Sequence, residues 1–199
     1  MDLLYFMLQR VFIPPRGRFF TSEMTSLTKS LRSSMHSSAS SMYHMYVNIF
    51  VLSEDPAEAA RMQCDKHVCK MILESGTMLC AAHPEGIPPW RRSHYNHPCT
   101  VWTRTSRANY EWLALHGLEL CSEYTRRYGR VHAAEDIIIW CAENVPPLPE
   151  IGPTPFVVSI KDKSLHTGDA VTSYRAYYLR DKRRFAKWKC GDPPPWWVP

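Results

Sequence analysis

The stretch from residue 55 to residue 82, DPAEAARMQCDKHVCKMILESGTMLCAA, constrains the fold most, because its apolar residues recur at helical spacing. Steps of three and four residues predict one buried face on a long helix. Ser53 or Asp55 can cap its first turn, and Pro56 suits the first helical position. The positions that make the predicted inner face are Cys64, Val68, Met71, Ile72, Ser75 and Leu79.

A polar stripe runs along the edge of this face. His67, Lys70 and Glu74 are spaced by three and four residues, so they line up along one side of the helix. Burial at the edge of an apolar face raises the pKa of a carboxyl group, and a neighbouring lysine lowers it again. Working carboxylates are often housed in this way, but an ordinary surface ion pair beside a structural histidine has the same spacing. Both interpretations of Glu74 stay open on periodicity alone.

The remainder of the chain predicts further helices. Apolar periodicity indicates helices over residues 100–128, 133–143 and 169–188, and Gly129 is placed to end the first of these. The connecting loops are rich in proline, above all between residues 83 and 99. We therefore expect an all-α fold, a single compact domain of about four helices over residues 45–199 with long Pro-rich loops.

Residues 1–44 differ in composition from the sequence that follows. They are basic, rich in serine and poor in acidic residues, which is typical of an organellar transit peptide. A disordered tail has a similar composition. A third possibility is that the start codon was assigned too early and that translation begins at Met42 or Met45. We favour the tail or the later start, and expect residues 1–44 to be a disordered extension or to precede the true start.

Positive charge gathers near the C-terminus. The net charge is +5, and residues 175–189 hold seven Lys or Arg against one acid, Asp181. Tyrosine, phenylalanine and tryptophan alternate with these cations, and such a segment can neutralise phosphates while stacking on bases. The alternative is that the aromatic residues belong to the core and that the charged residues form the solvent-exposed face of a helix. We expect a nucleic-acid partner and a monomeric protein.

The cysteines do not indicate a metal or a disulfide framework. There are seven, an odd number, and no CxxC pair occurs. Neither GxxxxGK nor GxGxxG occurs, so no nucleotide-phosphate loop is indicated. No apolar run reaches membrane-spanning length. We expect a cytoplasmic protein with reduced, buried cysteines, no metal and no cofactor.

Several of these residues together resemble a known family. Asn48 lies in a short apolar run, Asp65-Lys66-His67 follows, and Glu74 comes seven residues after the histidine. This arrangement is similar to that of the bacteriophage pyrimidine-dimer DNA glycosylases of the endonuclease V type, which are small all-α enzymes. His97 before a long aromatic helix, and the aromatic, lysine-bearing stretch from Phe185 onward, extend the resemblance over most of the domain.

The resemblance implies a DNA glycosylase that flips a nucleotide out of duplex DNA, cuts the N-glycosidic bond of a pyrimidine and leaves an abasic site. A pyrimidine dimer is the expected base, or a hypermodified one such as hydroxymethyl- or glucosyl-cytosine of phage DNA, which gives a role in DNA repair or in anti-phage defence. The implied catalytic residues are Glu74, His67 and Lys70. The expected DNA- or base-binding residues are Asn48, Lys66, Arg91, Arg92, His97, Arg175, Tyr178, Arg183, Arg184, Lys187, Trp188 and Lys189.

Two departures from the family pattern shape the expected reaction. Leu73 and Thr77 stand where the family has arginines beside its glutamate, so the contacts to phosphate and base must differ. The family also uses its N-terminal amine as a nucleophile, and residues 1–44 would separate that amine from the site. We therefore expect a monofunctional glycosylase with weak or no lyase activity. The competing classes are a non-enzymatic basic and aromatic DNA-binding module and a nucleotide-processing enzyme.

Overall fold

The computed structural model describes residues 47–191 and 193–198, and the regular secondary structure of this part is entirely helical. This confirms the predicted all-α class. The predicted tail over residues 1–44 lies outside the described residues. The α-helices are α3 (Pro56–Met62), α4 (Asp65–Ala81), α5 (Pro98–Thr105), α6 (Arg107–Tyr128), α7 (Glu135–Glu143) and α8 (Ala170–Tyr177). A short 3-10 turn, η1 (Lys163–Leu165), precedes α8, and a wide π-type turn, η2 (Tyr178–Lys182), continues it.

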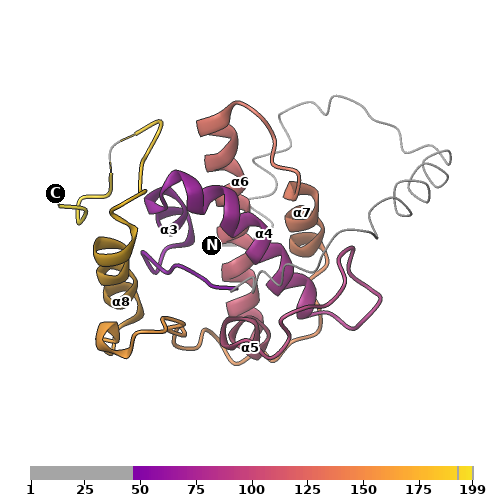
Figure 1. Cartoon of the computed structure of the whole chain (residues 1–199). Helices are drawn as coiled ribbons and strands as arrows, with labels where there is room; N and C mark the ends of the chain where they lie inside the picture. The colour runs from indigo at the N-terminus through magenta and orange to yellow at the C-terminus, as the bar shows by residue number, and fades with distance from the viewer. Residues whose placement is uncertain (1–46, 192, 199) are drawn as a thin grey trace, which may run out of the picture. The chain divides into compact units, whose positions relative to one another are not determined.

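Helix α6 is the centre of the packing. It contacts α3, α4, α5 and α7, and α4 crosses it while also touching α5 and α7 (Figure 1). Helix α8 and the C-terminal segment lie on the other side of α3 and α4 from α7 (Figure 1). The six positions predicted as the inner face of residues 55–82 are all buried, so the helical period of this stretch is confirmed. The core therefore lies between α4 and α6.

Two of the four predicted helices are each divided in two. The first breaks between α3 and α4, where Gln63 and Cys64 are both extended. The guanidinium group of Arg127 donates to the carbonyl oxygens of Arg61 and Gln63, at 3.0 and 2.8 Å. Carbonyls at a helix end have no partner within the helix, so a buried arginine that binds them stabilises the break.

The second predicted helix breaks at Ser106. This residue is extended, with φ −145° and ψ 158°, and its hydroxyl accepts from the backbone N–H of Asn109 to cap α6. The backbone N–H of Arg107 donates to the carbonyl of Pro149 at 3.0 Å. In a continuous helix this N–H would instead donate to a carbonyl of the preceding turn. Residues 98–105 therefore form a separate helix, α5.

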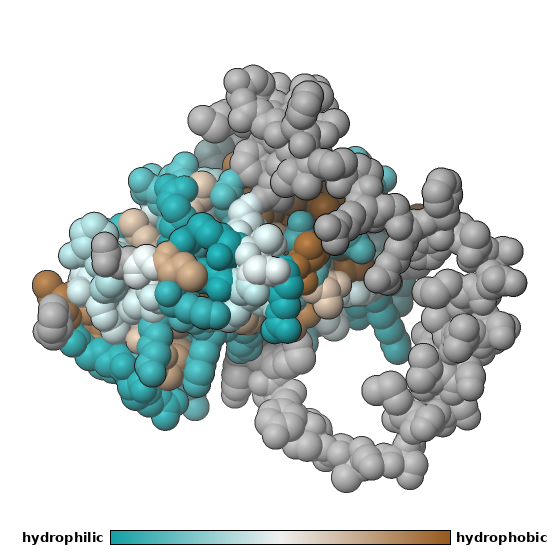
Figure 2. Space-filling model, turned by 90° about the horizontal axis from the view of Figure 1, so that it is seen from above, coloured by the Kyte–Doolittle hydropathy of each residue, from teal (hydrophilic) through white to brown (hydrophobic). Residues whose placement is uncertain are grey.

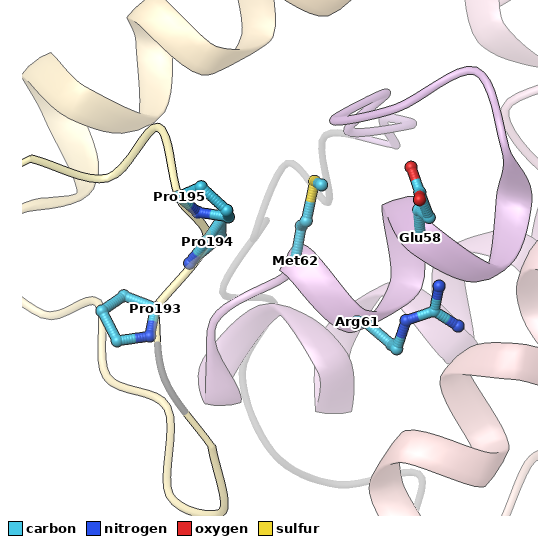
Figure 3. Close-up of a pocket in the computed structure, with 6 residues that line it drawn as sticks. All are labelled: Glu58, Arg61, Met62, Pro193, Pro194 and Pro195. Carbon is cyan, nitrogen blue, oxygen red and sulfur yellow. The ribbon is translucent and has the colours of Figure 1, made fainter.

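The C-terminal segment packs back onto α3 and the start of α4. The backbone N–H of Asp65 donates to the carbonyl of Lys187 at 2.9 Å, and the indole N–H of Trp196 lies 3.4 Å from the sulfur of Met62. A pocket of about 220 Å³ remains between the two segments, lined by Glu58, Arg61 and Met62 of α3 and by Pro193, Pro194 and Pro195 (Figure 3). None of the predicted catalytic residues lines it.

Hydrophilic side chains spread over much of the visible described surface (Figure 2). Within the described ranges, no helix combines the length and the apolar character that crossing a membrane requires.

Candidate active site

Glu74 lies in the middle of α4 and is 1% exposed. Its Oε2 accepts a hydrogen bond from the backbone N–H of Asn48 at 2.8 Å. The ammonium group of Lys70 lies 2.9 Å from Oε1 in an ion pair, although the atoms are not aligned for a hydrogen bond. The Lys70 side chain is 54% exposed, so it links a buried carboxylate to the surface. Glu74 is thus not an ordinary solvated partner of a surface pair.

Opposing influences act on the pKa of the Glu74 carboxyl group. Burial is the largest and raises it, and the net shift is upward. The Lys70 ammonium, the Asn48 N–H and the charge of His94 lower it in part. Partial compensation of this kind keeps a buried carboxyl group able to ionise while leaving its charge poorly solvated.

Asn48, which donates its backbone N–H to Glu74, is itself held by several hydrogen bonds. Its side-chain oxygen accepts from the hydroxyl of Tyr174 at 2.7 Å, and its side-chain nitrogen donates to the carbonyl of Ser159 at 3.1 Å. The thiol of Cys99 also approaches the same oxygen, at 3.8 Å. Asn48 was predicted to contact DNA or a base, but its amide is occupied by partners within the protein.

The loop over residues 83–97 borders the turn of α4 that carries Glu74. The ring of Trp90 packs against Gly76, where an added Cβ would come within 2.9 Å of the ring. His97 caps α5, and its Nε2 lies 3.4 Å from the hydroxyl of Ser159. His94 is exposed and adopts a φ of 50°. The loop therefore brings two histidines to the neighbourhood of Glu74.

One of the two arginines of this loop, Arg92, is hydrogen-bonded to the first residue of the loop. Arg92 donates to the carbonyl of His83 at 2.9 Å, and its guanidinium lies 4.6 Å from the ring centre of Tyr95. Arg91 is exposed. Both remain predicted DNA contacts, and the stacking of Arg92 on Tyr95 keeps its cation at the surface of the loop.

His67 lies on α4 seven residues before Glu74, about 10 Å away along the helix axis. Its ring stacks on Phe50 at 4.4 Å, and its Nδ1 is hydrogen-bonded to the hydroxyl of Tyr178. Burial, followed by the charges of Lys182 and Lys70, lowers the pKa of His67 to about 3. His67 is therefore a neutral, buried ring. Tyr178 is 0% exposed, so a stacking base would have no access to its ring.

The lowered pKa of His67 predicts a specific pH dependence of stability. The unfolded chain takes up the proton near pH 6.5 and the folded chain only near pH 3, so the contribution is complete above 6.5 and is lost as the pH falls toward 3. We expect His67→Gln to flatten the fall in the free energy of unfolding between pH 6.5 and 4, by up to about 1.4 kcal/mol per pH unit. Urea titrations at several pH values measure this, and an unchanged slope would contradict it.

A group of cations surrounds Phe185 and forms a basic surface. The ammonium groups of Lys66 and Lys182 lie 5.0 and 6.0 Å from the centre of this ring, and the guanidinium of Arg184 lies at 5.9 Å. We define the basic surface by these three cations together with Arg183, Lys187 and Lys189. All but Lys182, which is half-buried, are exposed.

One cation of the basic surface, Lys66, lies on the same helix as Glu74. Lys66 precedes Glu74 by eight residues, about 12 Å along the axis of α4, and Lys70 lies on the same side between them. A strand of duplex DNA rises about 3.4 Å per base pair, so this distance corresponds to three or four base pairs.

Two other predicted DNA contacts have structural partners. Arg175 donates to the carbonyl of Leu52 at 2.9 Å, and Trp188 donates to the carbonyl of Met62 at 3.2 Å. Both side chains are half-buried and attach α8 and the C-terminal segment to the residues around α3.

Sequence reasoning did not find four residues close to Glu74. They are His94, Cys99, Ser159 and Tyr174. Tyr174 is 126 residues from Asn48, and no local pattern indicates that its hydroxyl would meet that side chain. The only available signal was the position of His94 in a long polar loop.

Comparisons with known proteins give one family match. The family described as pyrimidine dimer DNA glycosylase matches residues 47–136, a range that includes Asn48, Lys70, Glu74 and His97. Neither the curated proteins nor the solved structures provide a match. The matched range covers α3 to α6 and the start of α7, the same helices that build the core around Glu74. Residues 47–136 of this chain are therefore assigned to the pyrimidine dimer DNA glycosylase family.

Proposed function

We propose that this protein hydrolyses the N-glycosidic bond of a damaged or hypermodified pyrimidine in duplex DNA and that Glu74 is its key carboxylate. The observation that carries the proposal is the environment of Glu74, which is buried, paired with an exposed lysine and on the same helix as Lys66 of the basic surface. The family match supports action on DNA.

The chemistry needs a negative charge close to the sugar. As the bond between C1′ and the base nitrogen breaks, positive charge develops on the sugar ring. A carboxylate held in a poorly solvated site stabilises that charge more strongly than one in water, and it can also orient the attacking water. The Asn48 N–H donates to Oε2 of Glu74, and this backbone contact fixes the position of the carboxylate before substrate arrives.

Access to Glu74 requires a covering side chain to move. Only 1% of Glu74 is exposed, whereas the side chain of Lys70 is 54% exposed and ends 2.9 Å from the carboxylate. A phosphate of the bound strand would attract the Lys70 ammonium outward and open the carboxylate to a flipped nucleotide. In this proposal Lys70 acts both as the ion-pair partner and as the movable cover.

The proposed reaction stops at an abasic site. A lyase step needs an uncharged amine that attacks the sugar. Lys70 is the amine closest to Glu74 among the contacts described, and it pairs with that carboxylate as a cation, which is not a nucleophile. Strand scission without added base, together with trapping of the protein on DNA by borohydride, would show a bifunctional enzyme instead.

Counting abasic sites tests the proposal and identifies the base. The protein is incubated with duplex DNA that contains ultraviolet dimers, with phage DNA that carries hydroxymethyl- or glucosyl-cytosine, and with unmodified DNA as the control. We expect abasic sites in one of the first two substrates and none in the control. A dimer substrate indicates a repair enzyme, and a modified cytosine indicates a factor in anti-phage defence. Salt-dependent DNA binding with no abasic sites in any substrate would instead indicate a non-enzymatic DNA-binding module.

A further inference from the structure

The residues that hold Asn48 come from a part of the chain that the family match does not reach. Ser159 and Tyr174 lie after residue 136, where the matched range ends. We propose that Tyr174 is a positioning residue for the reaction, which sets the location of the Glu74 carboxylate through Asn48; this inference rests on the proposed function of Glu74. The C-terminal part of the chain then supplies part of the catalytic geometry in addition to a basic surface.

The hydroxyl group of Tyr174 ties two segments together. It donates to the Asn48 side-chain oxygen at 2.7 Å and accepts from the backbone N–H of Ser159 at 2.9 Å. The carbonyl of Ser159 in turn accepts from the Asn48 amide at 3.1 Å, which closes a ring of hydrogen bonds. Both atoms of the Asn48 amide therefore have partners in the C-terminal part of the chain, and its oxygen also accepts from the backbone N–H of Ile49 at 2.8 Å.

Fixing the Asn48 side chain also fixes its backbone. The N–H of the same residue donates to Oε2 of Glu74 at 2.8 Å. Tyr174 itself is 0% exposed and packs edge-on against Phe50, with ring centres 5.8 Å apart, so its hydroxyl has little freedom to move. Loss of the hydroxyl would let Asn48 shift and would lengthen its bond to the carboxylate.

Three charged or titratable groups in the described part of the chain face Glu74, and they lie on three different segments. Lys70 lies on the same helix, His94 is in the loop, and the buried thiol of Cys99, whose pKa is raised to about 12, is on α5. Neither Lys70 nor His94 is a hydrogen-bond partner of the Tyr174 hydroxyl among the contacts of the described residues. A change in the Glu74 pKa after removal of that hydroxyl would therefore report the Asn48 contact, which lowers the pKa of Glu74.

The test compares Tyr174→Phe with Tyr110→Phe. Tyr110 is also 0% exposed, and its hydroxyl bonds to the carbonyl of Cys141 and to His83. Removing the Tyr110 hydroxyl therefore also removes buried hydrogen bonds, but not those of Asn48. We expect Tyr174→Phe to lower kcat by about 10- to 100-fold with KM unchanged, because a small misplacement of a catalytic group has effects of this size. The kcat of Tyr110→Phe should stay within about twofold of that of the parent protein, because this substitution leaves the position of Glu74 unchanged.

Two further measurements separate positioning from a general structural role. Carbon-13 NMR of the carboxyl groups, with the Glu74 signal assigned from Glu74→Gln, should show a higher Glu74 pKa in Tyr174→Phe than in the parent or in Tyr110→Phe. In a double-mutant cycle, Tyr174→Phe should add nothing to the loss caused by Asn48→Ala, because both act on one contact. If Tyr174→Phe is unfolded at the assay temperature, Asn48→Ala alone must show the lowered kcat and the raised pKa.

The outcomes distinguish this inference from the proposed function. If the parent protein releases no base but the Glu74 pKa rises in Tyr174→Phe, the proposed function is wrong and the positioning role stands. If the parent is active and the two tyrosine variants have the same kcat and the same Glu74 pKa, the positioning role is wrong. The positioning role would also be wrong if the double variant lost kcat by the product of the factors lost in Tyr174→Phe and in Asn48→Ala.

Discussion

Glu74→Gln is expected to lower the rate of base excision by about 10²- to 10⁴-fold, the range found when a single charged or acid–base group is removed from an active site. The amide has almost the shape of the carboxylate and can still accept from the Asn48 N–H, so the fold should persist. The loss therefore reports the charge. Single-turnover excision on the substrate identified by counting abasic sites measures the effect.

DNA affinity should move in the opposite direction in the same variant. Removing a negative charge beside Lys70 releases a cation to contact phosphate, so binding should be retained or strengthened. Glu143→Gln is a matched control, because Glu143 is an exposed residue at the end of α7. Equal excision rates in Glu74→Gln and Glu143→Gln would show that the buried carboxylate takes no part in the chemistry.

Arg127→Ala should have the largest effect on stability. The Arg127 side chain is 1% exposed, pairs with Glu123 at 2.9 Å and Asp65 at 3.1 Å, and donates to two carbonyls at the break between α3 and α4. Removing Arg127 takes the ion-pair partner from Asp65 and the donor from the two carbonyls, and leaves Glu123 paired with Arg126 alone. We expect the free energy of unfolding to fall by about 3–5 kcal/mol.

The neighbouring arginine provides the control for this measurement. Arg126 also pairs with Glu123, at 2.7 Å, but its side chain is 49% exposed. Arg126→Ala should therefore cost no more than about 1 kcal/mol, as is usual for surface ion pairs. Denaturant titrations of both variants give the comparison. Equal losses in the two variants would contradict the structural role assigned to Arg127.

Local chemistry made much of the fold predictable. Asp55 caps α3 through the N–H of Glu58, and Gly129 ends α6 with a left-handed φ of 67°. Both features depend on residue types with a strong preference at helix ends. The buried face of α4 follows in the same way from apolar residues at helical spacing.

The helix breaks were not predictable, because their causes lie far away in the sequence. The break before α4 is stabilised by Arg127, more than 60 residues later. The break at Ser106 depends partly on the carbonyl of Pro149. A run of helix-forming residues cannot show that a distant side chain or carbonyl will compete for its backbone groups.

The candidate site was predictable to a similar extent. The spacing on α4 placed Glu74 beside Lys70 at the edge of the core, and the structure has them 2.9 Å apart. The neutral state of His67 depends on Phe50 and Tyr178, which the spacing on one helix does not reveal. Long-range contacts of this kind decide which polar residue is structural and which is available for chemistry.

Mass-spectrometric detection of free base released from duplex DNA tests the central claim most directly. The native protein and Glu74→Gln are each incubated with the dimer-containing and the modified-cytosine duplexes, and both the soluble fraction and the DNA are analysed. Our account predicts free pyrimidine base, or an excised dimer end in the DNA, in amounts exceeding the protein with the native chain and almost none with Glu74→Gln. Absence of such products with both proteins, or equal amounts with both, would contradict it.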